Sequence, residues 1–326
     1  RELHLENRIL RKELQREYDS TNIIGKSPAI EQIFEMIKAV SDTDSTVLIS
    51  GNSGTGKELV AKALHYNSKR SNRPFIALNC GAISENLIES ELFGHKKGSF
   101  TGAGHSTDGK FSQAANGTLF LDEIGNLPLT MQTKLLTVLE QRTLRRIGAE
   151  KDIPIDIRLI SATNQPIKEK IDRGEFRVEL YYRLNVMPIQ MPPLRDRRED
   201  IPDLAHFLVS KIAKSQGREL EIEDSALGVL MRYDWPGNVR ELENCLERAS
   251  VMSEAGRIDR HVVNLTGLQS NAPSSVSAGS VSTMDIDDPD LDERERVIAA
   301  LEQAGVTVVR SPADMGVRMQ EVLADS

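Results

Sequence analysis

The sequence predicts an α/β fold with a parallel sheet, followed by a smaller helical subdomain. Between about residues 21 and 190, short apolar runs alternate with helical patterns, which is typical of a parallel sheet with helices on both faces. A glycine-rich loop follows the first apolar run and precedes a helical pattern, as expected in such a fold. From Pro192-Pro193 to about residue 264 only helical patterns occur, so this part is expected to pack beside the sheet as a unit of its own.

Five apolar runs are expected to form the strands of the sheet. Parallel sheets of this kind bind ligands at the carboxyl ends of their strands, so chemistry is expected just after each run. The runs cover residues 46–50, 75–79, 118–121, 158–162 and 186–189.

Composition excludes several classes of protein. The 326 residues are 39% hydrophobic and 28% charged, which is ordinary for a soluble globular protein of about two domains. The net charge of −8 argues against a protein that coats nucleic acid, although a small DNA-reading module stays possible. Two isolated cysteines, Cys80 and Cys245, do not form a disulfide framework, so a cytoplasmic location is expected. No apolar run is long enough to span a bilayer, and no membrane partner is expected.

The two ends of the chain differ from its middle. Because the chain begins with Arg1, we expect a fragment of a longer protein. Residues 1–20 predict a linker or signalling helix, although an ordinary amphipathic surface helix fits equally well. Residues 265–290 are rich in Ser, Pro, Asp and Gly and predict a flexible linker. Residues 291–326 begin with a further predicted helix, from Glu293 to about residue 303.

The loop over residues 51–58 is a candidate phosphate site. Its glycines let the backbone curl around phosphates, and its amides and the following helix N-terminus supply positive potential. Lys57 is expected to reach the β- and γ-phosphates of ATP. Glu58 stands where a Ser or Thr would touch Mg²⁺, so another group or water must replace that hydroxyl. The loop consists of Gly51, Asn52, Ser53, Gly54, Thr55, Gly56, Lys57 and Glu58.

Polar residues at other strand ends complete this candidate site. Asp122 is suited to hold Mg²⁺ through water, and Glu123 to polarise an attacking water, unless the pair only caps a strand or helix. Asn164 is a candidate for orienting water or sensing the γ-phosphate. Asn79 is a candidate hydrogen-bond partner that holds Glu123 away from water. Either asparagine could equally be a turn residue that satisfies backbone groups.

Three long signatures resemble those of the sigma-54-dependent activators, a family of AAA+ ATPases also called bacterial enhancer-binding proteins. They are the loop 51–58 with its unusual glutamate, GKFSQAANGTLFLDEI over residues 109–124, and WPGNVREL over residues 235–242. The resemblance runs from about residue 22 to 264 and is closest to the nitrogen-fixation regulators. It implies an AAA+ P-loop domain over residues 21–191, with a five-stranded parallel sheet between helices, and an all-helical lid over residues 192–264. One departure is Asn116, where the family usually has glycine.

The resemblance assigns roles to two further arginines. Arg177 and Arg183 look like arginine fingers that act on a neighbouring subunit's nucleotide, where a guanidinium stabilises charge on the transferred phosphoryl group. On one helix they would point about 120° apart, so their roles need not be equal. The alternative is that both are solvated surface arginines.

Other implied residues lie around the nucleotide. Arg240 resembles the sensor that ties the lid to the nucleotide of its own subunit; the alternative is an ion pair with Glu241 or Glu243. Ile24 and Gly25 resemble the family's contact with the adenine side, although ordinary core packing would use the same apolar surface.

A loop resembles the family's contact with sigma-54. Two glycines bracket an aromatic and a hydroxyl residue there, so a mobile loop could present Phe100 to a partner. The family usually has alanine at Ser99, and a glycine-rich turn with Phe100 in the core is the alternative. Residues 142–156 fall where the family carries a second mobile loop, although their charge also suits a solvated loop. The contact loop consists of Gly98, Ser99, Phe100, Thr101, Gly102 and Ala103.

The resemblance implies a ring oligomer, expected to be a hexamer, that hydrolyses ATP with Mg²⁺ to remodel sigma-54 RNA polymerase holoenzyme and open promoters. The start of residues 291–326 resembles the first helix of the family's DNA-binding domain, but no recognition helix follows, so contact with enhancer DNA is expected only of the full-length protein. Two alternatives remain: another AAA+ remodelling ATPase, and a nucleotide-gated DNA-binding regulator with little hydrolysis. The acidic composition and the missing recognition helix weigh against the second.

Overall fold

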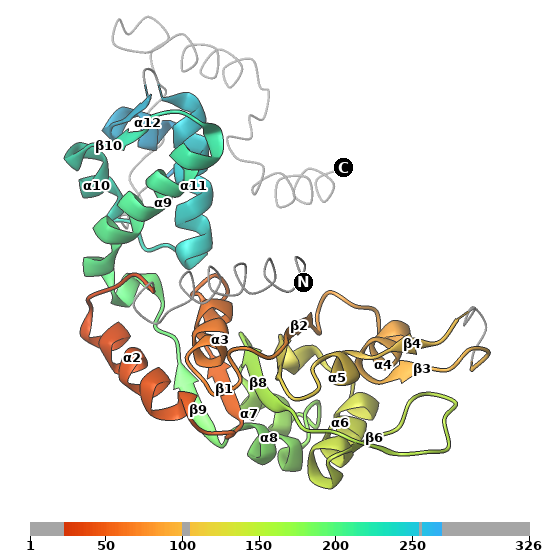
Figure 1. The fold of residues 1–326 in the computed structure, drawn as a ribbon. Helices are drawn as coiled ribbons and strands as arrows, with labels where there is room; N and C mark the ends of the chain where they lie inside the picture. The colour runs from red at the N-terminus through yellow and green to blue at the C-terminus, as the bar shows by residue number, and fades with distance from the viewer. Residues whose placement is uncertain (1–22, 100–104, 254–255, 269–326) are drawn as a thin grey trace, which may run out of the picture. The chain divides into compact units, whose positions relative to one another are not determined.

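A five-stranded parallel sheet organises the first part of the chain. The computed structural model describes residues 23–99, 105–253 and 256–268, and its main sheet has the strand order β2-β5-β8-β1-β9 (Figure 1). All four pairings in this sheet are parallel, which confirms the predicted class and the five predicted strands. The strands are β1 (Val47–Ser50), β2 (Phe75–Asn79), β5 (Thr118–Asp122), β8 (Arg158–Thr163) and β9 (Met187–Gln190).

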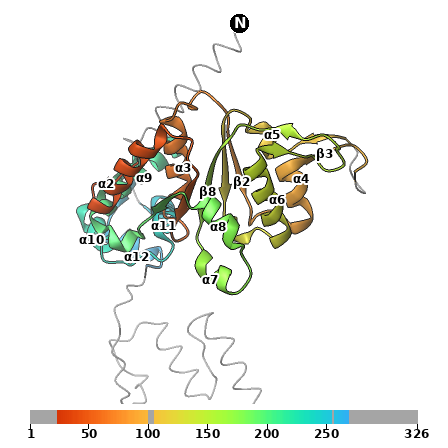
Figure 2. The same ribbon diagram turned by 90° about the horizontal axis from the view of Figure 1, so that it is seen from below.

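Helices cover both faces of the sheet because successive strand residues point to opposite sides. In β5, Leu119 and Leu121 pack into one apolar cluster and Phe120 packs into the other. Figure 2 shows α2 and α3 on one side of the sheet and α4 and α6 on the other. The helices of this part are α2 (Pro28–Ser41), α3 (Lys57–Tyr66), α4 (Glu85–Phe93), α5 (Lys110–Gln113), η2 (Ile124–Asn126), α6 (Leu129–Gln141), α7 (Ile167–Asp172) and α8 (Val178–Leu184).

A helical lid follows the sheet, as predicted, and has an apolar core of its own around the buried Trp235. The Trp235 indole N–H donates to the carbonyl of Leu230 at 2.8 Å, so the ring is buried with its polar atom satisfied. The lid also holds a two-residue parallel strand pair that the helical patterns did not predict, since so short a run has no periodicity. Its elements are η3 (Leu194–Asp196), η4 (Arg198–Asp200), α9 (Ile201–Gln216), β10 (Glu221–Ile222), α10 (Asp224–Leu230), α11 (Asn238–Met252), β11 (Arg257–Ile258) and α12 (Arg260–Leu265).

Two short antiparallel pairs extend from the sheet domain. β3 (Gly94–His95) pairs with β4 (Thr107–Asp108), and β6 (Thr143–Leu144) pairs with β7 (Ile153–Pro154). Neither pair was predicted from the sequence, because each strand is only two residues long.

Several predicted features lie outside the described residues. They are the helix over residues 1–20, the loop tip with Phe100, Thr101, Gly102 and Ala103, most of the linker over 265–290, and the segment 291–326. No helix in the described part of the chain is long and apolar enough to cross a membrane.

Asn116 adopts a backbone conformation that favours glycine. Its φ of 60° places it in the left-handed region, which glycine adopts without strain and asparagine tolerates better than most residues. Its N–H donates to the carbonyl of Asp156 at 2.7 Å. The departure from the family pattern therefore keeps the turn and adds no group to the phosphate site.

Candidate nucleotide site

The loop of residues 51–58 joins β1 to the N-terminus of α3, as the sequence predicts. Gly54 (φ 76°) and Gly56 (φ 99°) occupy left-handed conformations that side-chain-bearing residues rarely adopt. A Cβ on Gly54 would also lie only 2.3 Å from the carbonyl oxygen of Gly237 in the lid. The N–H of Gly51 donates to the Thr163 carbonyl at 3.2 Å, which anchors the loop to the end of β8.

Lys57 fills the centre of this loop. Its ammonium donates to the carbonyls of Gly51 and Asn52, both at 2.9 Å. Burial lowers the pKa of Lys57, while the nearby carboxylates of Asp122 and Glu123 act in the opposite direction. The lysine is therefore within the field of both acids, as a phosphate-binding lysine beside a magnesium site requires.

Asp122 and Glu123 lie at the carboxyl end of β5, near the phosphate loop. β5 and β1 both flank β8, so the three strand ends adjoin in the order β5, β8, β1. Burial raises the pKa of Asp122, although the N–H of Glu123, which donates to Asp122 Oδ1 at 2.9 Å, and the ammonium of Lys57 oppose this rise. Glu123 itself is in the left-handed region with φ 52°, a strained conformation for glutamate of the kind that collects at functional sites.

The partner of Glu123 differs from the one predicted. Asn126 Nδ2 donates to Glu123 Oε2 at 3.2 Å, whereas Asn79 Oδ1 accepts from the N–H groups of Gly81 and Ala82 at 2.8 and 3.1 Å. Asn79 therefore has the turn contacts of the alternative interpretation, and its hydrogen bond to Glu123 stays a prediction. Sequence reasoning missed Asn126, although its place three residues after Glu123, in the turn that ends β5, was a usable signal.

Asn79 and Asn164 nevertheless lie at the same edge as the acids. Asn79 pairs in register with Asp122 across β2 and β5. Asn164 follows the last residue of β8, the strand between the phosphate loop and the acids, and its side chain is exposed. The role of Asn164 in orienting water or sensing the γ-phosphate stays a prediction.

The donor set at this edge fits a magnesium ion that is shared with a nucleotide. Among the described residues, no group of three or more His, Cys, Asp or Glu side chains converges to hold a metal alone. Mg²⁺ is commonly bound by one or two carboxylates together with substrate phosphates, and Asp122 provides one. Glu58 pairs with Lys62 at 3.0 Å on the first turn of α3, and the hydroxyl of Thr55 donates to the Asn52 carbonyl. Asp122 is therefore the residue that would hold the ion.

Lid residues approach the loop from the other side. The Cβ of Arg240 would be 3.1 Å from a Cβ on Gly54, and the charge of Arg240 lowers the pKa of Lys57. The alternative of an ion pair is not realised in the described chain, because Glu241 accepts from the N–H of Gly237 and Glu243 pairs with Lys211. The side chain of Arg240 is thus available at the loop.

The predicted adenine-side residues lie between the start of α2 and the lid. Ile24 is partly buried against the lid core. A Cβ on Gly25 would lie 3.0 Å from a carboxylate oxygen of Asp200. Both residues therefore line the junction with the lid. The apolar packing of Ile24 is compatible with contact to the adenine side and with ordinary core packing.

Arg177 and Arg183 lie against α6 rather than at the loop. Arg177 precedes α8 as its N-cap residue, so the expectation that both arginines sit on one helix is wrong, because the helix begins one residue later. Arg177 Nη1 is 3.5 Å from Thr133 Oγ1, and Arg183 Nη2 donates to the Leu139 carbonyl at 3.0 Å. Both side chains are exposed, as residues that reach a second subunit must be.

The base of the predicted sigma-54 loop is tied to the second loop. β3 and β4 bracket residues 96–106, and Ser99 Oγ donates to the Lys96 carbonyl at 2.8 Å. Ile147, between β6 and β7, donates to the Gly94 carbonyl at 2.9 Å and accepts from the Lys96 N–H at 3.0 Å. The segment 142–156 is therefore more than a solvated loop, since it is bonded to the base of the first.

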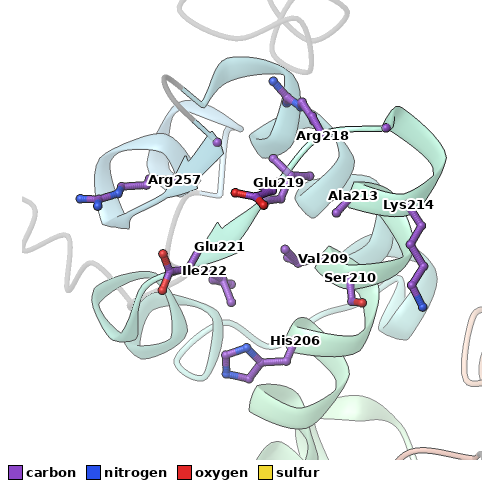
Figure 3. A pocket seen from close by; sticks show the side chains of 13 residues that line it. His206, Val209, Ser210, Ala213, Lys214, Arg218, Glu219, Glu221, Ile222 and Arg257 are labelled. Atoms are coloured by element: carbon purple, nitrogen blue, oxygen red, sulfur yellow. The ribbon is translucent and has the colours of Figure 1, made fainter.

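A separate hollow of about 1020 Å³ lies in the lid, away from the phosphate loop (Figure 3). In Figure 3, Arg257 and Lys214 extend outward on opposite sides of it. Its lining also includes Glu219 and Glu221, so acidic and basic side chains both line it, and these side chains are exposed to solvent. We assign it no ligand, because its polar groups do not converge as those of a binding site do.

Comparison with known proteins supports the arrangement just described. Residues 23–190 match the model of the sigma-54 interaction domain, and residues 195–279 match that of the AAA+ ATPase lid domain. The first match covers more than half of the chain. The protein belongs to the sigma-54 interaction domain family of AAA+ proteins.

Curated relatives place the chain near one branch of this family. It is 49% identical over 314 residues to a Nif-specific regulatory protein of Azotobacter vinelandii, covering 96% of this chain and 60% of the relative. It is 51% identical over 301 residues to the Nif-specific regulatory protein of Klebsiella pneumoniae, covering 92% and 57%. The chain thus spans about 60% of the length of these relatives.

Solved structures of other proteins resemble this chain in fold. NtrX from Brucella abortus in complex with ATP is 36% identical, with a TM-score of 0.68 over 76% of this chain and 58% of that chain. A RuvB mutant from Thermotoga maritima, at 17% identity and a TM-score of 0.50 over 76% of this chain and 71% of that chain, shares the fold alone.

Proposed function

We propose that this chain is the ATP-hydrolysing motor of a transcription activator that remodels sigma-54 RNA polymerase holoenzyme in the cytoplasm. One observation carries the proposal: Lys57, Asp122 and Glu123 meet at one edge of a sheet whose residues match the sigma-54 interaction domain. The ATP bound by the related NtrX supports the choice of nucleotide.

The residues have distinct roles in the reaction of ATP with water to give ADP and phosphate. Lys57 and the loop amides hold the phosphates, and Asp122 holds Mg²⁺, which neutralises phosphate charge when bound. Glu123 is the base that orients the attacking water, and Asn126 fixes its carboxylate until that water arrives. In this proposal Asn164 senses the γ-phosphate, and Arg240 contacts the phosphates from the lid.

The motor works as a ring, and we propose that a neighbour's Arg177 or Arg183 completes each site. Heterologous contacts that close on themselves produce such rings, and a hexamer is the expected size. Hydrolysis changes the position of the loop over residues 98–103, which carries Phe100 to sigma-54. The bonds between this loop's base and residue 147 give a path for that change. Enhancer DNA is a partner of the longer protein.

Complex formation with sigma-54 tests the proposal. The chain is mixed with purified sigma-54 and ADP plus aluminium fluoride, which imitates the transferring phosphoryl group, and the mixture is analysed by gel filtration. We expect a complex that requires the analogue and is lost in Lys57→Ala and in Phe100→Ala. Ser99→Ala is a second variant in the same loop: it introduces the alanine that the family usually has there and loses only the hydroxyl bond to the Lys96 carbonyl, so the complex should be retained. ATP turnover without any complex would favour another AAA+ remodelling ATPase, and DNA binding unaffected by Lys57→Ala would favour the nucleotide-gated regulator.

A further inference from the structure

Three successive carbonyls of the phosphate loop are bound by donors from outside the sheet domain. One donor is a guanidinium in the connection between β9 and α9, and two are at the start of α11 in the lid. The bonds run from Asn238 Nδ2 to the Ser53 carbonyl (2.8 Å), from the Val239 N–H to the Gly54 carbonyl (3.0 Å), and from Arg197 Nη2 to the Thr55 carbonyl (3.0 Å).

These bonds fix the direction of the loop's amide groups. A trans peptide is planar, so its C=O and N–H point in opposite directions. Holding the carbonyls of residues 53–55 therefore also fixes the direction of the N–H groups of residues 54–56. Glycine-rich loops bind phosphate through backbone N–H groups held in this way.

The two side chains that make these bonds are themselves fixed. Asn238 is 1% exposed, with φ 56°, and its Oδ1 accepts from the Leu194 N–H at 2.8 Å. Arg197 is 3% exposed, and its Nη2 donates to the loop while its Nε has no hydrogen-bond partner. Removing a guanidinium from water costs free energy. The bond from Arg197 to the loop carbonyl is therefore a specific buried contact, not an incidental surface contact.

The same connection also reaches the start of α2. Asp200, three residues after Arg197, accepts from the N–H groups of Lys26 and Ser27 at 2.7 and 2.8 Å and from the Ser27 hydroxyl at 2.7 Å. Burial lowers the pKa of Arg197, and the nearby carboxylate of Asp200 acts in the opposite direction. Arg197 and Asp200 thus join the phosphate loop, the lid and the segment next to Gly25.

We propose that Arg197 and Asn238 are positioning residues that preorganise the phosphate loop from its lid side, so that nucleotide binding and lid docking stabilise each other. The inference rests on the proposed binding of ATP at this loop. Preorganisation raises affinity because the loop no longer loses conformational freedom on binding. Coupling of this kind is reciprocal, so bound nucleotide also holds the lid.

Asn238→Asp tests the amide donor of Asn238. Aspartate tolerates the left-handed backbone and keeps the acceptor for the Leu194 N–H, but it replaces the donor to the Ser53 carbonyl with an oxygen. We expect affinity for ADP and for ATP, measured by calorimetry on the full chain, to fall to a similar extent, roughly tenfold. The KM for ATP should rise with little change in kcat, since the bonds act before hydrolysis. Asn238→Gly, which keeps the backbone conformation, is the second variant if the aspartate chain does not fold.

Arg197→Gln tests the other side chain, with Arg198→Gln as its matched control. Arg198 is the next residue, but its guanidinium donates to the carbonyls of Met231 and Arg232 instead of the loop. We expect weaker nucleotide binding only in Arg197→Gln, and a smaller nucleotide-induced protection of α11 amides from hydrogen exchange. Equal affinity and equal protection in wild type, Asn238→Asp and Arg197→Gln would overturn the inference. A wild-type chain that binds no nucleotide would instead overturn the proposed function.

Discussion

His65 shows how one buried side chain makes stability depend on pH. It is fully buried near the end of α3, with Nδ1 2.8 Å from Thr118 Oγ1. Burial lowers its pKa to about 4 from the ordinary 6.5; the Arg73 backbone partly opposes this, and the charge of Arg158 lowers the pKa further. As the pH falls below about 6.5, His65 becomes protonated in the unfolded chain but stays neutral in the folded chain until the pH reaches about 4. Stability is therefore lost between about pH 6.5 and 4.

The size of this effect can be measured by comparing two pH values. We expect His65 to contribute a loss of about 2 kcal/mol in the free energy of unfolding between pH 7 and pH 5. His65→Asn keeps an atom near the Thr118 hydroxyl but cannot titrate there. Urea unfolding measures the free energy of unfolding of the wild type and the variant at both pH values. Between pH 7 and pH 5 this free energy should decrease by about 2 kcal/mol less in the variant than in the wild type. An equal loss in the two chains would show that His65 is not the titrating group.

At the scale of elements, a buried arginine holds the ends of two helices. Arg158, at the start of β8, is fully buried. Its Nη1 donates to the carbonyls of Ser41 and Leu64 at 3.0 and 3.2 Å, and its Nη2 to that of Val40 at 2.9 Å. Val40 and Ser41 end α2 and Leu64 lies in the last turn of α3, where carbonyls lack partners within the helix. The guanidinium therefore donates hydrogen bonds to carbonyls at both helix ends.

Arg158→Met should destabilise the sheet domain by about 2–4 kcal/mol, because it leaves the buried carbonyls of Ser41 and Leu64 without a donor. The Val40 carbonyl keeps its bonds from the Thr43 N–H and hydroxyl. Urea unfolding measures the change. Arg145→Met is a control that removes an exposed ion pair with Asp152 and is expected to have a much smaller effect. A loss from Arg158→Met no larger than that of the control would contradict the role assigned to the guanidinium.

The same elements show what the sequence could predict. The five strands and the loop of residues 51–58 were predictable, because apolar runs and glycine spacing are local signals. The carbonyl partners of Arg158, and the donors from Arg197 and Asn238 to the phosphate loop, join residues more than 90 positions apart and leave no local pattern. The bond from Asn126 to Glu123 was missed for a different reason, since Asn79 and Asn126 both lie near Glu123 and only the turn geometry shows which amide contacts it here.

At the scale of the whole molecule, the proposed function divides each ATP site between two chains. Lys57 is affected by the charges of Asp122, Glu123 and Arg240, whereas Arg177 and Arg183 are bonded to α6. An exposed arginine that is separate from its own chain's phosphate loop is suited to the site of a neighbour. Turnover per chain should then rise with protein concentration as the oligomer forms.

Mixing two inactive variants tests this division. Lys57→Ala keeps the arginines but cannot hold phosphate, and Arg183→Ala keeps the phosphate loop but cannot supply the guanidinium; each should lose roughly 100-fold or more in ATP turnover. In a mixed ring, a Lys57→Ala chain can present its Arg183 to the intact loop of an Arg183→Ala neighbour. We therefore expect phosphate release from the mixture to exceed the sum of the separate rates. Because a site completed within one chain would stay broken in both partners, a mixture no more active than that sum would exclude action of Arg183 between subunits.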